Sequence, residues 1–288
     1  MIIRSYCSLS EKVINEVLIL EKIGKEQDKL KGSVFLDTSS NFNQHIHSVF
    51  LLYEDRELIS ILSMFIPTQQ EAEISAYTLP DYRRNGYFKA LLAKAVEELR
   101  KFNIHDLLLV CEKQSISGQE VMVALNAEYE HTEYSLRLNK HRYAARDAYR
   151  LSLIRPRFQD LDKVIYTSMQ TFDDSYEDSK SLVENCFESE TREQYLAVLN
   201  DEIIGLGSVN RESDEASIFG FGIVPEYRGK GYGKELLHLM IDRLYQMGKT
   251  EIMLDVSSEN VRALELYKKS GFQTEAVYVY YRKKVSEV

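Results

Sequence analysis

The sequence predicts an α/β protein built from two tandem copies of one unit, each a mixed central sheet flanked by helices. Residues 80–92 (PDYRRNGYFKALL) recur as residues 225–237 (PEYRGKGYGKELL), at an offset of 145 in a chain of 288 residues. A strand-like run precedes each copy of this motif, and a helix and a second strand follow it. Strand runs interrupted by single helices are typical of a mixed sheet and not of a bundle or sandwich.

In the first unit, apolar and β-branched runs predict strands, with periodic apolar residues marking helices between them. The expected strands are 1–6, 48–53, 57–66, 73–79 and 106–111. The expected helices are 9–22 and 88–102, with an irregular polar stretch after the first.

The second unit repeats this order. The expected strands are 150–156, 195–200, 202–209, 216–224 and 251–256, and the expected helices are 161–172, 234–246 and 261–270. Asn200-Asp201 predicts a tight turn between two strands. The polar segment 139–142 is the expected boundary between domains 1–141 and 149–288.

Composition and charge limit the classes of partner. The net charge is −9, from 36 basic and 45 acidic residues, and no basic stripe typical of nucleic-acid binding is present. No apolar run reaches the ~18 residues of a membrane span, and the N-terminus lacks the layout of a secretion signal. Cys7, Cys111 and Cys186 are odd in number and widely spaced, so we expect free thiols and a cytoplasmic location.

A glycine-rich loop lies between a strand and a helix in the second unit. In Arg228-Gly229-Lys230-Gly231-Tyr232-Gly233, the glycines allow close backbone approach, and the following helix presents open N–H groups. A pyrophosphate fits such a loop. Lys234 is followed by Glu235, so the Ser/Thr of a nucleotide-binding P-loop is missing, and the spacing also differs from a dinucleotide fingerprint. A glycine-rich turn without a ligand is the remaining alternative.

The second unit resembles the GNAT superfamily of N-acetyltransferases. Val224-Pro225, Arg228, Gly231 and Gly233 match its acyl-CoA signature, and Asn260 with Leu266–Phe272 resembles its next motif. The resemblance implies acetyl-CoA as donor and a splayed strand whose backbone holds the pantetheine. The implied cofactor-binding residues are Phe221, Gly222, Ile223, Val224, Arg228, Gly229, Lys230, Gly231, Tyr232, Gly233, Lys234 and Asn260.

The first unit matches the family less closely. Arg83 and Gly86 are present, but Phe88 replaces the last small residue of the loop. Aligned from Phe272 and Tyr129, Ala124 stands where Tyr267 does and Glu128 where Gly271 does. The unit either binds a second acyl-CoA or is a structural partner, and we favour loss of catalysis. The second cofactor site would comprise Thr78, Arg83, Arg84, Asn85, Gly86, Tyr87 and Phe88.

The resemblance also suggests catalytic roles. Tyr267 is the candidate acid that protonates the leaving thiolate, because a phenol has a pKa of ~10; alternatively it only packs on its helix. Asp255 is the candidate base, and partial burial would raise its pKa; alternatively it is a solvated strand carboxylate. Asn260 caps the following helix and contacts the CoA arm in the family. Gly271 is expected to end that helix in a left-handed cap, with Phe272 packing back.

The acceptor is less defined. In the family, a helical segment at residues 173–193 helps to wall the acceptor site, and here it is acidic. It either attracts a cationic amine or is a solvated face. Tyr278, Tyr280 and Tyr281 lie on a terminal strand and either pack or line the acceptor cleft. His45 and His47 lack further ligands at suitable spacing, so we expect no metal.

These features predict an enzyme that moves an acetyl group from acetyl-CoA directly to a primary amine of a small molecule or peptide. A non-catalytic acyl-CoA sensor or scaffold is the alternative from another class, and a different acyl group is a third. The sequence leaves open whether the protein is a monomer or a homodimer.

Overall fold

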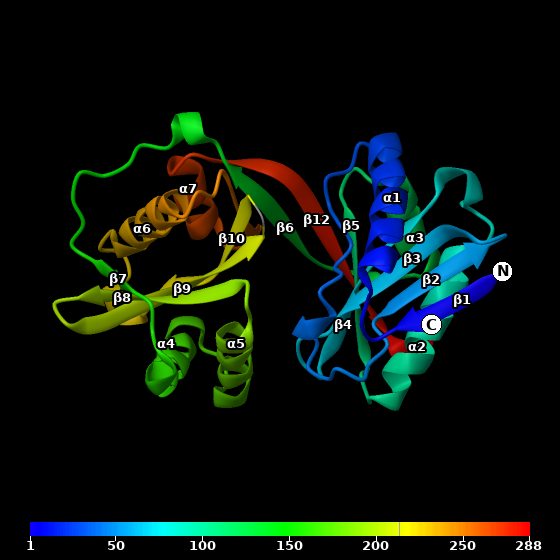
Figure 1. The fold of residues 1–288 in the computed structure, drawn as a ribbon, viewed down its shortest axis with the longest axis horizontal. Helices are drawn as coiled ribbons and strands as arrows, with labels where there is room; N and C mark the ends of the chain where they lie inside the picture. The colour runs from blue at the N-terminus through cyan, green and yellow to red at the C-terminus, as the bar shows by residue number, and fades with distance from the viewer. Residues whose placement is uncertain (213) are drawn as a thin grey trace. The chain divides into compact units, whose positions relative to one another are not determined.

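The computed structural model describes residues 1–212 and 214–288, which form two compact units (Figure 1). The first unit comprises Met1–Glu133 and Ala276–Val288, and the second comprises Tyr134–Glu275. Each unit is a mixed sheet with flanking helices, which confirms the predicted fold class.

The first unit has the strand order β1-β2-β3-β4-β5-β12, with β6 beside β12. The pairs β1–β2, β2–β3 and β3–β4 are antiparallel, whereas β4 and β5 are parallel. Helix α1 packs on β3 and β4, and α2 packs on β2 and β3. The elements are β1 Ile2–Tyr6, α1 Glu11–Asp28, β2 Val49–Glu54, β3 Glu57–Phe65, β4 Glu71–Thr78, α2 Tyr87–Lys101, β5 Asp106–Glu112, α3 Ile116–Ala124 and β6 Glu128–Leu138.

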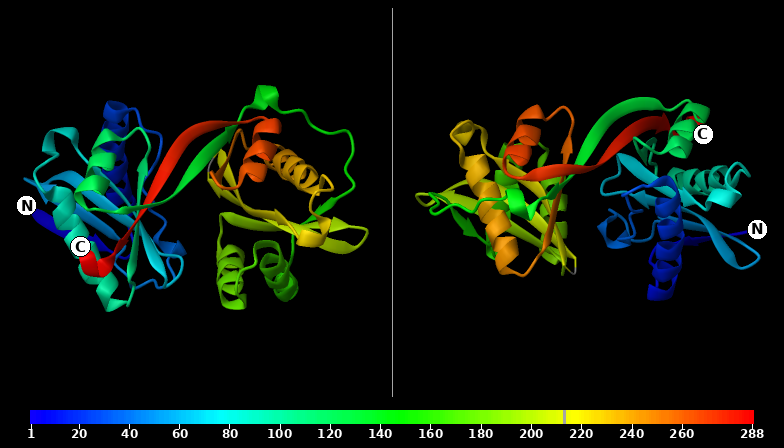
Figure 2. Two further views of the ribbon diagram at one scale, coloured as in Figure 1. Left: turned by 180° about the vertical axis from the view of Figure 1, so that it is seen from behind. Right: turned by 90° about the horizontal axis from the view of Figure 1, so that it is seen from above.

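The second unit has the strand order β6-β11-β10-β9-β8-β7. Helices α4 and α5 cover one face of its sheet, and α6 and α7 lie on the opposite face (Figure 2). The elements are β7 Ser152–Ile154, α4 Leu161–Phe172, α5 Tyr176–Glu188, β8 Arg192–Leu199, β9 Glu202–Glu212, β10 Glu215–Ile223, α6 Tyr232–Gln246, β11 Glu251–Ser257, α7 Val261–Lys269 and β12 Phe272–Lys284.

The last strand corrects the predicted domain limits of 1–141 and 149–288. Residues Tyr278–Lys284 of β12 pair antiparallel with Asp106–Glu112 of β5, so the chain's end completes the first unit. A side-chain contact supports this pairing, since Lys284 Nζ donates to the Asp106 carboxylate of β5 at 2.6 Å. Long-range strand pairing therefore divides the chain differently from its repeat.

Most predicted elements are present, with shifted ends. Helix α4 occupies the predicted 161–172, and Asn200 and Asp201 both have positive φ, as a tight hairpin turn requires. Helix α1 extends six residues beyond the predicted 9–22. The pattern of strands and helices did not predict α5, although the family resemblance implied a helical segment there.

The segment between the repeats is fastened to α6 of the second unit. Glu235 is fully buried, and its carboxylate accepts hydrogen bonds from the backbone N–H groups of Arg150 and Leu151 and from the Arg150 guanidinium. Burial raises the pKa of Glu235, but these hydrogen bonds and the guanidinium charge outweigh it, and the net pKa is lowered.

We predict that Glu235→Gln lowers the free energy of unfolding by about 2 kcal/mol at pH 7, because a buried ion pair loses one partner. Since the folded-state pKa is lowered, the wild-type advantage exists above the unfolded pKa of about 4.3 and disappears as the pH falls through the folded value. Urea unfolding at pH 7 and pH 3 measures this. An equal difference at both pH values would contradict the ionic role.

Candidate functional site

The glycine loop before α6 presents a row of open amides. Gly229 and Gly231 have φ values of 75° and 85°, and α6 begins at Tyr232. Within the described ranges, the N–H groups of residues 229–234 have no hydrogen-bond acceptor. The first N–H groups of a helix carry partial positive charge, so this loop is shaped to bind an anion.

The two cationic side chains of the loop have structural partners. Arg228 Nε donates to the Ile223 carbonyl at 2.8 Å, and Arg228 Nη2 donates to the Thr171 carbonyl at 2.6 Å. Lys230 Nζ donates to the Glu226 carbonyl at 2.9 Å. Carbonyl partners leave both positive charges uncompensated, so these residues hold the loop in place and add to its positive potential.

The two parallel strands beside the loop separate, as predicted for a pantetheine-binding strand. Strands β10 and β11 pair only over Glu215–Ser217 and Glu251–Met253, although both continue further. A register shift between Phe219 and Gly222, with Gly220 at φ 49°, marks the irregular part of β10. A Cβ at Gly222 would overlap Thr171, so the close backbone approach requires glycine.

Tyr267 lies against the separated part of β10. Its ring centroid is 6.1 Å from Phe221 and 6.1 Å from Phe272, and only 7% of the residue is exposed. Burial raises its pKa to about 12. Its hydroxyl has no hydrogen-bond partner within the described ranges. The side chain is therefore a neutral phenol at neutral pH, with a proton available to a ligand.

The other candidates on β11 and α7 have clear places. Asp255 points to the face opposite the buried Leu254 and Val256, as predicted, but it is exposed, so the partial burial expected of a base is absent. Asn260 Oδ1 accepts from the Ala263 N–H at 3.2 Å, which confirms the helix cap. Gly271 has φ 103°, and Phe272 packs on Tyr267, as predicted.

The first unit repeats the loop geometry at the same offset of 145. Gly86 has φ 82° and precedes α2, and Arg84 adopts φ 67° in place of Gly229. Arg83 Nε donates to the Thr78 carbonyl, as Arg228 does to Ile223, but its other nitrogens bond Asp28. The N–H groups of residues 84–89 likewise find no acceptor in the described chain. Both loops therefore have an anion-binding backbone.

The first unit differs where chemistry is expected. Helix α3 matches α7 at the 145 offset, so Met122 stands where Tyr267 does, and Asn126, with φ 49°, stands where Gly271 does. The alignment with Ala124 and Glu128 is corrected, because it used an offset of 143, whereas α3 (Ile116–Ala124) and α7 (Val261–Lys269) match at an offset of 145. No hydroxyl occupies the position, as expected.

In the first unit, side chains and the segment around Gly32 occupy the space beside the separated strands. Strands β4 and β5 pair only over Glu71–Ile74 and Asp106–Leu109. Tyr77 replaces Gly222 here, and its hydroxyl donates to the Gly32 carbonyl at 2.8 Å. The N–H group of Gly32 donates to the buried Glu112 carboxylate at 2.6 Å. The chain's own segment thus occupies this region.

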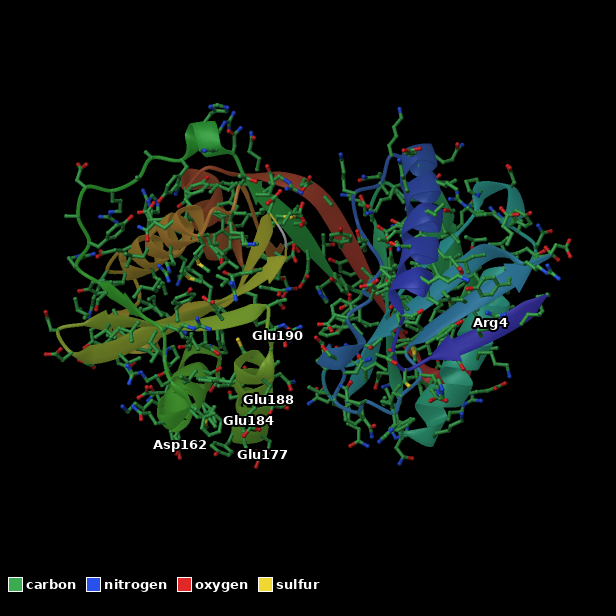
Figure 3. The ribbon with its side chains drawn as sticks, in the orientation of Figure 1. Arg4, Asp162, Glu177, Glu184, Glu188 and Glu190 are labelled. Carbon is green, nitrogen blue, oxygen red and sulfur yellow. The ribbon has the colours of Figure 1, made fainter. Side chains whose placement is uncertain are left out.

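The acidic segment around α5 is mostly solvent-exposed. Figure 3 shows Glu177, Glu184, Glu188 and Glu190 around this helix. Glu193, which the sequence grouped with them, is instead buried and paired with Arg155 and Arg211 at 3.1 Å. The exposed carboxylates form a negative face of the second unit.

The histidines and the terminal tyrosines contribute to the first unit. His47 pairs with Glu98 at 3.0 Å, and among residues 1–212 and 214–288 no group of three His, Cys, Asp or Glu side chains is arranged to hold a metal. Tyr280 stacks on His131, and Tyr281 donates to Gln119. Tyr278 lies beside Gly32. These tyrosines pack within the first unit.

The three cysteines are free, as predicted. Cys186 is buried, and burial raises the pKa of its thiol to about 11. Burial and the neighbouring Glu112 raise the pKa of the Cys111 thiol to about 11 as well. Neither thiol supplies a thiolate nucleophile at neutral pH.

Comparison with known proteins gives the same family for both halves. Residues 16–119 and 156–272 match the model of the acetyltransferase (GNAT) family. One relative is a [ribosomal protein bS18]-alanine N-acetyltransferase of Haemophilus influenzae, 39% identical over 83 residues, or 28% of this chain and 56% of the relative. A mycothiol acetyltransferase of Corynebacterium efficiens is 34% identical over 84 residues, or 29% of this chain and 28% of the relative. The matches therefore span less than two thirds of these relatives.

Solved structures share the fold across nearly the whole chain. A GCN5-related N-acetyltransferase from Sphaerobacter thermophilus superposes with a TM-score of 0.79 at 16% identity, covering 99% of this chain and 95% of the other. A tandem GNAT protein from the clavulanic acid biosynthesis pathway gives 0.75 at 13% identity, covering 99% and 98%. None of the helices in the described ranges combines the length and apolarity needed to cross a membrane.

We predict opposite effects for two glycine substitutions in the loop. Gly231→Ala should lower the free energy of unfolding by about 1 kcal/mol, since its φ of 85° strains an L-residue. Gly233→Ala should raise it by up to about 1 kcal/mol, because Gly233 is helical and its Cβ would meet Leu266 at an ordinary 3.8 Å. Urea unfolding of both variants tests this, and equal effects would contradict it.

Proposed function

Since the chain belongs to the acetyltransferase (GNAT) family, we propose that its second unit transfers an acetyl group from acetyl-CoA directly to a primary amine. The supporting observation is the convergence of three features in that unit. These are the open amides of residues 229–234, the separation of β10 from β11, and the hydroxyl of Tyr267, whose side chain is largely buried.

The donor would lie along the loop and β10. The amides of residues 229–234 would bind its diphosphate, with Arg228, Lys230 and Lys234 adding positive potential. The pantetheine would run along Phe221–Val224 in the manner of an added strand. Asn260 starts the neighbouring helix α7 and would contact the same arm.

The reaction is an addition followed by an elimination. The neutral amine nitrogen attacks the thioester carbonyl carbon, and the carbonyl oxygen becomes an oxyanion. The carbon–sulfur bond then breaks, and the departing thiolate takes the Tyr267 proton. The attacking nitrogen, which carries an extra proton after the addition, releases that proton to solvent, and the phenolate recovers a proton from solvent. No acyl-enzyme is needed, which agrees with the raised thiol pKa of Cys186.

The amine must first lose a proton, because an ammonium has no lone pair. Asp255 is the proposed base, in contact with solvent on the face of β11 opposite Leu254. Because Asp255 is in contact with solvent, it would accept the proton and pass it to water.

We assign no catalysis to the first unit. Tyr77 stands where Gly222 does, Met122 replaces Tyr267, and the Gly32 segment fills the region beside the separated strands. The repeated loop, residues 84–89, keeps the geometry for an anion without the chemical groups for transfer.

The acceptor is an amine of a small molecule or peptide. The names of the two relatives described above give a ribosomal-protein alanine and mycothiol, which supports a peptide or a small molecule as the acceptor here. The exposed carboxylates of Glu177, Glu188 and Glu190 would favour a cationic acceptor. The protein would act as a monomer or a homodimer in the cytoplasm.

We predict that Tyr267→Phe lowers kcat by about 100-fold while leaving the Kd for acetyl-CoA within about two-fold, because only the proton donor is lost. Turnover of acetyl-CoA with a panel of amines, monitored by thiol release, measures kcat. Unchanged kcat would remove Tyr267 from the mechanism. Tight binding of acetyl-CoA without turnover for any acceptor would instead favour an acyl-CoA sensor.

A matched pair of variants separates the two loops. Lys234 and Lys89 occupy equivalent first-turn positions of α6 and α2, and both are exposed. We predict that Lys234→Glu raises the KM for acetyl-CoA about ten-fold, since it places a negative charge at the diphosphate site. Lys89→Glu should leave KM unchanged. The reverse result would assign catalysis to the first unit.

A further inference from the structure

A cavity of about 470 Å³ adjoins the glycine loop within the second unit. Gly231 and Lys234, at the start of α6, form one side of it. Ser270 at the end of α7 forms another. The connecting segment before β7, residues 142–150, forms a third side, since Arg142 and Arg146 also line the cavity. The cavity therefore begins where the open amides end.

Five cationic side chains line this cavity, in a chain whose net charge is −9. Two of them are paired, Arg150 with Glu235 and Lys269 with Glu265. The other three, Arg142, Arg146 and Lys234, form no ion pair with the described carboxylates. Such a concentration of unpaired positive charge favours an anion.

Two buried polar side chains on the cavity wall also lack hydrogen-bond partners among residues 1–212 and 214–288. His238 is 5% exposed, and neither ring nitrogen is hydrogen-bonded. Ser270 is 3% exposed, and its Oγ is unbonded. Buried polar atoms are nearly always satisfied in folded proteins, so unsatisfied ones on a cavity wall indicate a ligand that bonds them. A phosphate oxygen accepts from a hydroxyl, an imidazole N–H and a guanidinium alike.

We propose that this cavity binds the ribose 3′-phosphate of the acetyl-CoA whose diphosphate lies on residues 229–234. The inference rests on the proposed function, since it names how that donor is selected. Coenzyme A carries a phosphomonoester, with a charge near −2, in addition to its diphosphate. Gly231 and Lys234 belong to both the loop and the cavity, so one ligand can reach both. Arg142 and Arg146 then act as specificity determinants contributed by the connecting segment.

The test compares two donors that differ only in this phosphate. Calorimetry would measure the Kd of CoA and of 3′-dephospho-CoA for the wild-type chain, for the double variant Arg142→Gln/Arg146→Gln, and for the control Arg157→Gln. Arg142, Arg146 and Arg157 are exposed, so the variants should fold, and Arg157 does not line the cavity. Inorganic phosphate would serve as a third ligand.

We expect the wild type and the control to bind CoA at least about ten-fold more tightly than dephospho-CoA, as charge-assisted hydrogen bonds imply. The double variant should lose this preference and bind dephospho-CoA as the wild type does. If the wild type binds CoA and dephospho-CoA equally tightly, or if the double variant weakens the binding of both equally, this inference is overturned but the proposed function is not. If inorganic phosphate binds but CoA binds no more tightly than dephospho-CoA, the cavity binds a separate anion, and the inference is also overturned. No affinity for either CoA species would overturn the proposed function together with this inference.

Discussion

The left-handed backbone at Gly231 is the constraint on which the candidate site depends. With φ at 85°, the chain turns from an extended segment into α6, and six consecutive amides find no acceptor in the part of the chain that the structure describes. Arg228 then ties this turn to the ends of β10 and α4 through two carbonyl groups. The chain's own contacts therefore hold the open amides in place, which lowers the cost of ordering the loop when an anion binds.

The two repeats act as an internal comparison of fold and function. Both keep the left-handed residue before the helix, an Arg bonded to the preceding strand, and a Tyr–Glu hydrogen bond, Tyr82 to Glu57 and Tyr227 to Glu202. The first unit even accepts Arg84 at φ 67°, at a strain cost of roughly 1 kcal/mol. The units diverge at the residues beside the separated strands. The loop is thus a property of the fold, whereas the groups around it decide whether chemistry follows.

The sequence predicted the repeat, most elements and the glycine loop because these are local patterns. Helix α5 was missed by the periodicity because only Ser179, Val183 and Cys186 of its 13 residues are buried, too narrow an apolar stripe among many acidic residues. The match of Met122 to Tyr267 was missed because it depends on where α3 ends. The basic cavity was not foreseen, since its lining comes from segments 142–150, 231–238 and 269–270, which only the fold brings together.

The largest difference between sequence and structure concerns the last strand, and it bears on why the first unit is retained. Strand β12 begins at Phe272, which packs on Tyr267, and its later residues Tyr278–Lys284 pair with β5. Val279 and Tyr280 are buried there, and Val285 packs in the first unit's core. Without β5, this stretch would present unpaired backbone groups and would expose the apolar side chains of Val279 and Tyr280. The helix that carries the proposed acid is thus followed directly by a strand that needs the first unit. The pairing demands of the chain's own end therefore give a reason to keep a repeat to which we assign no catalysis.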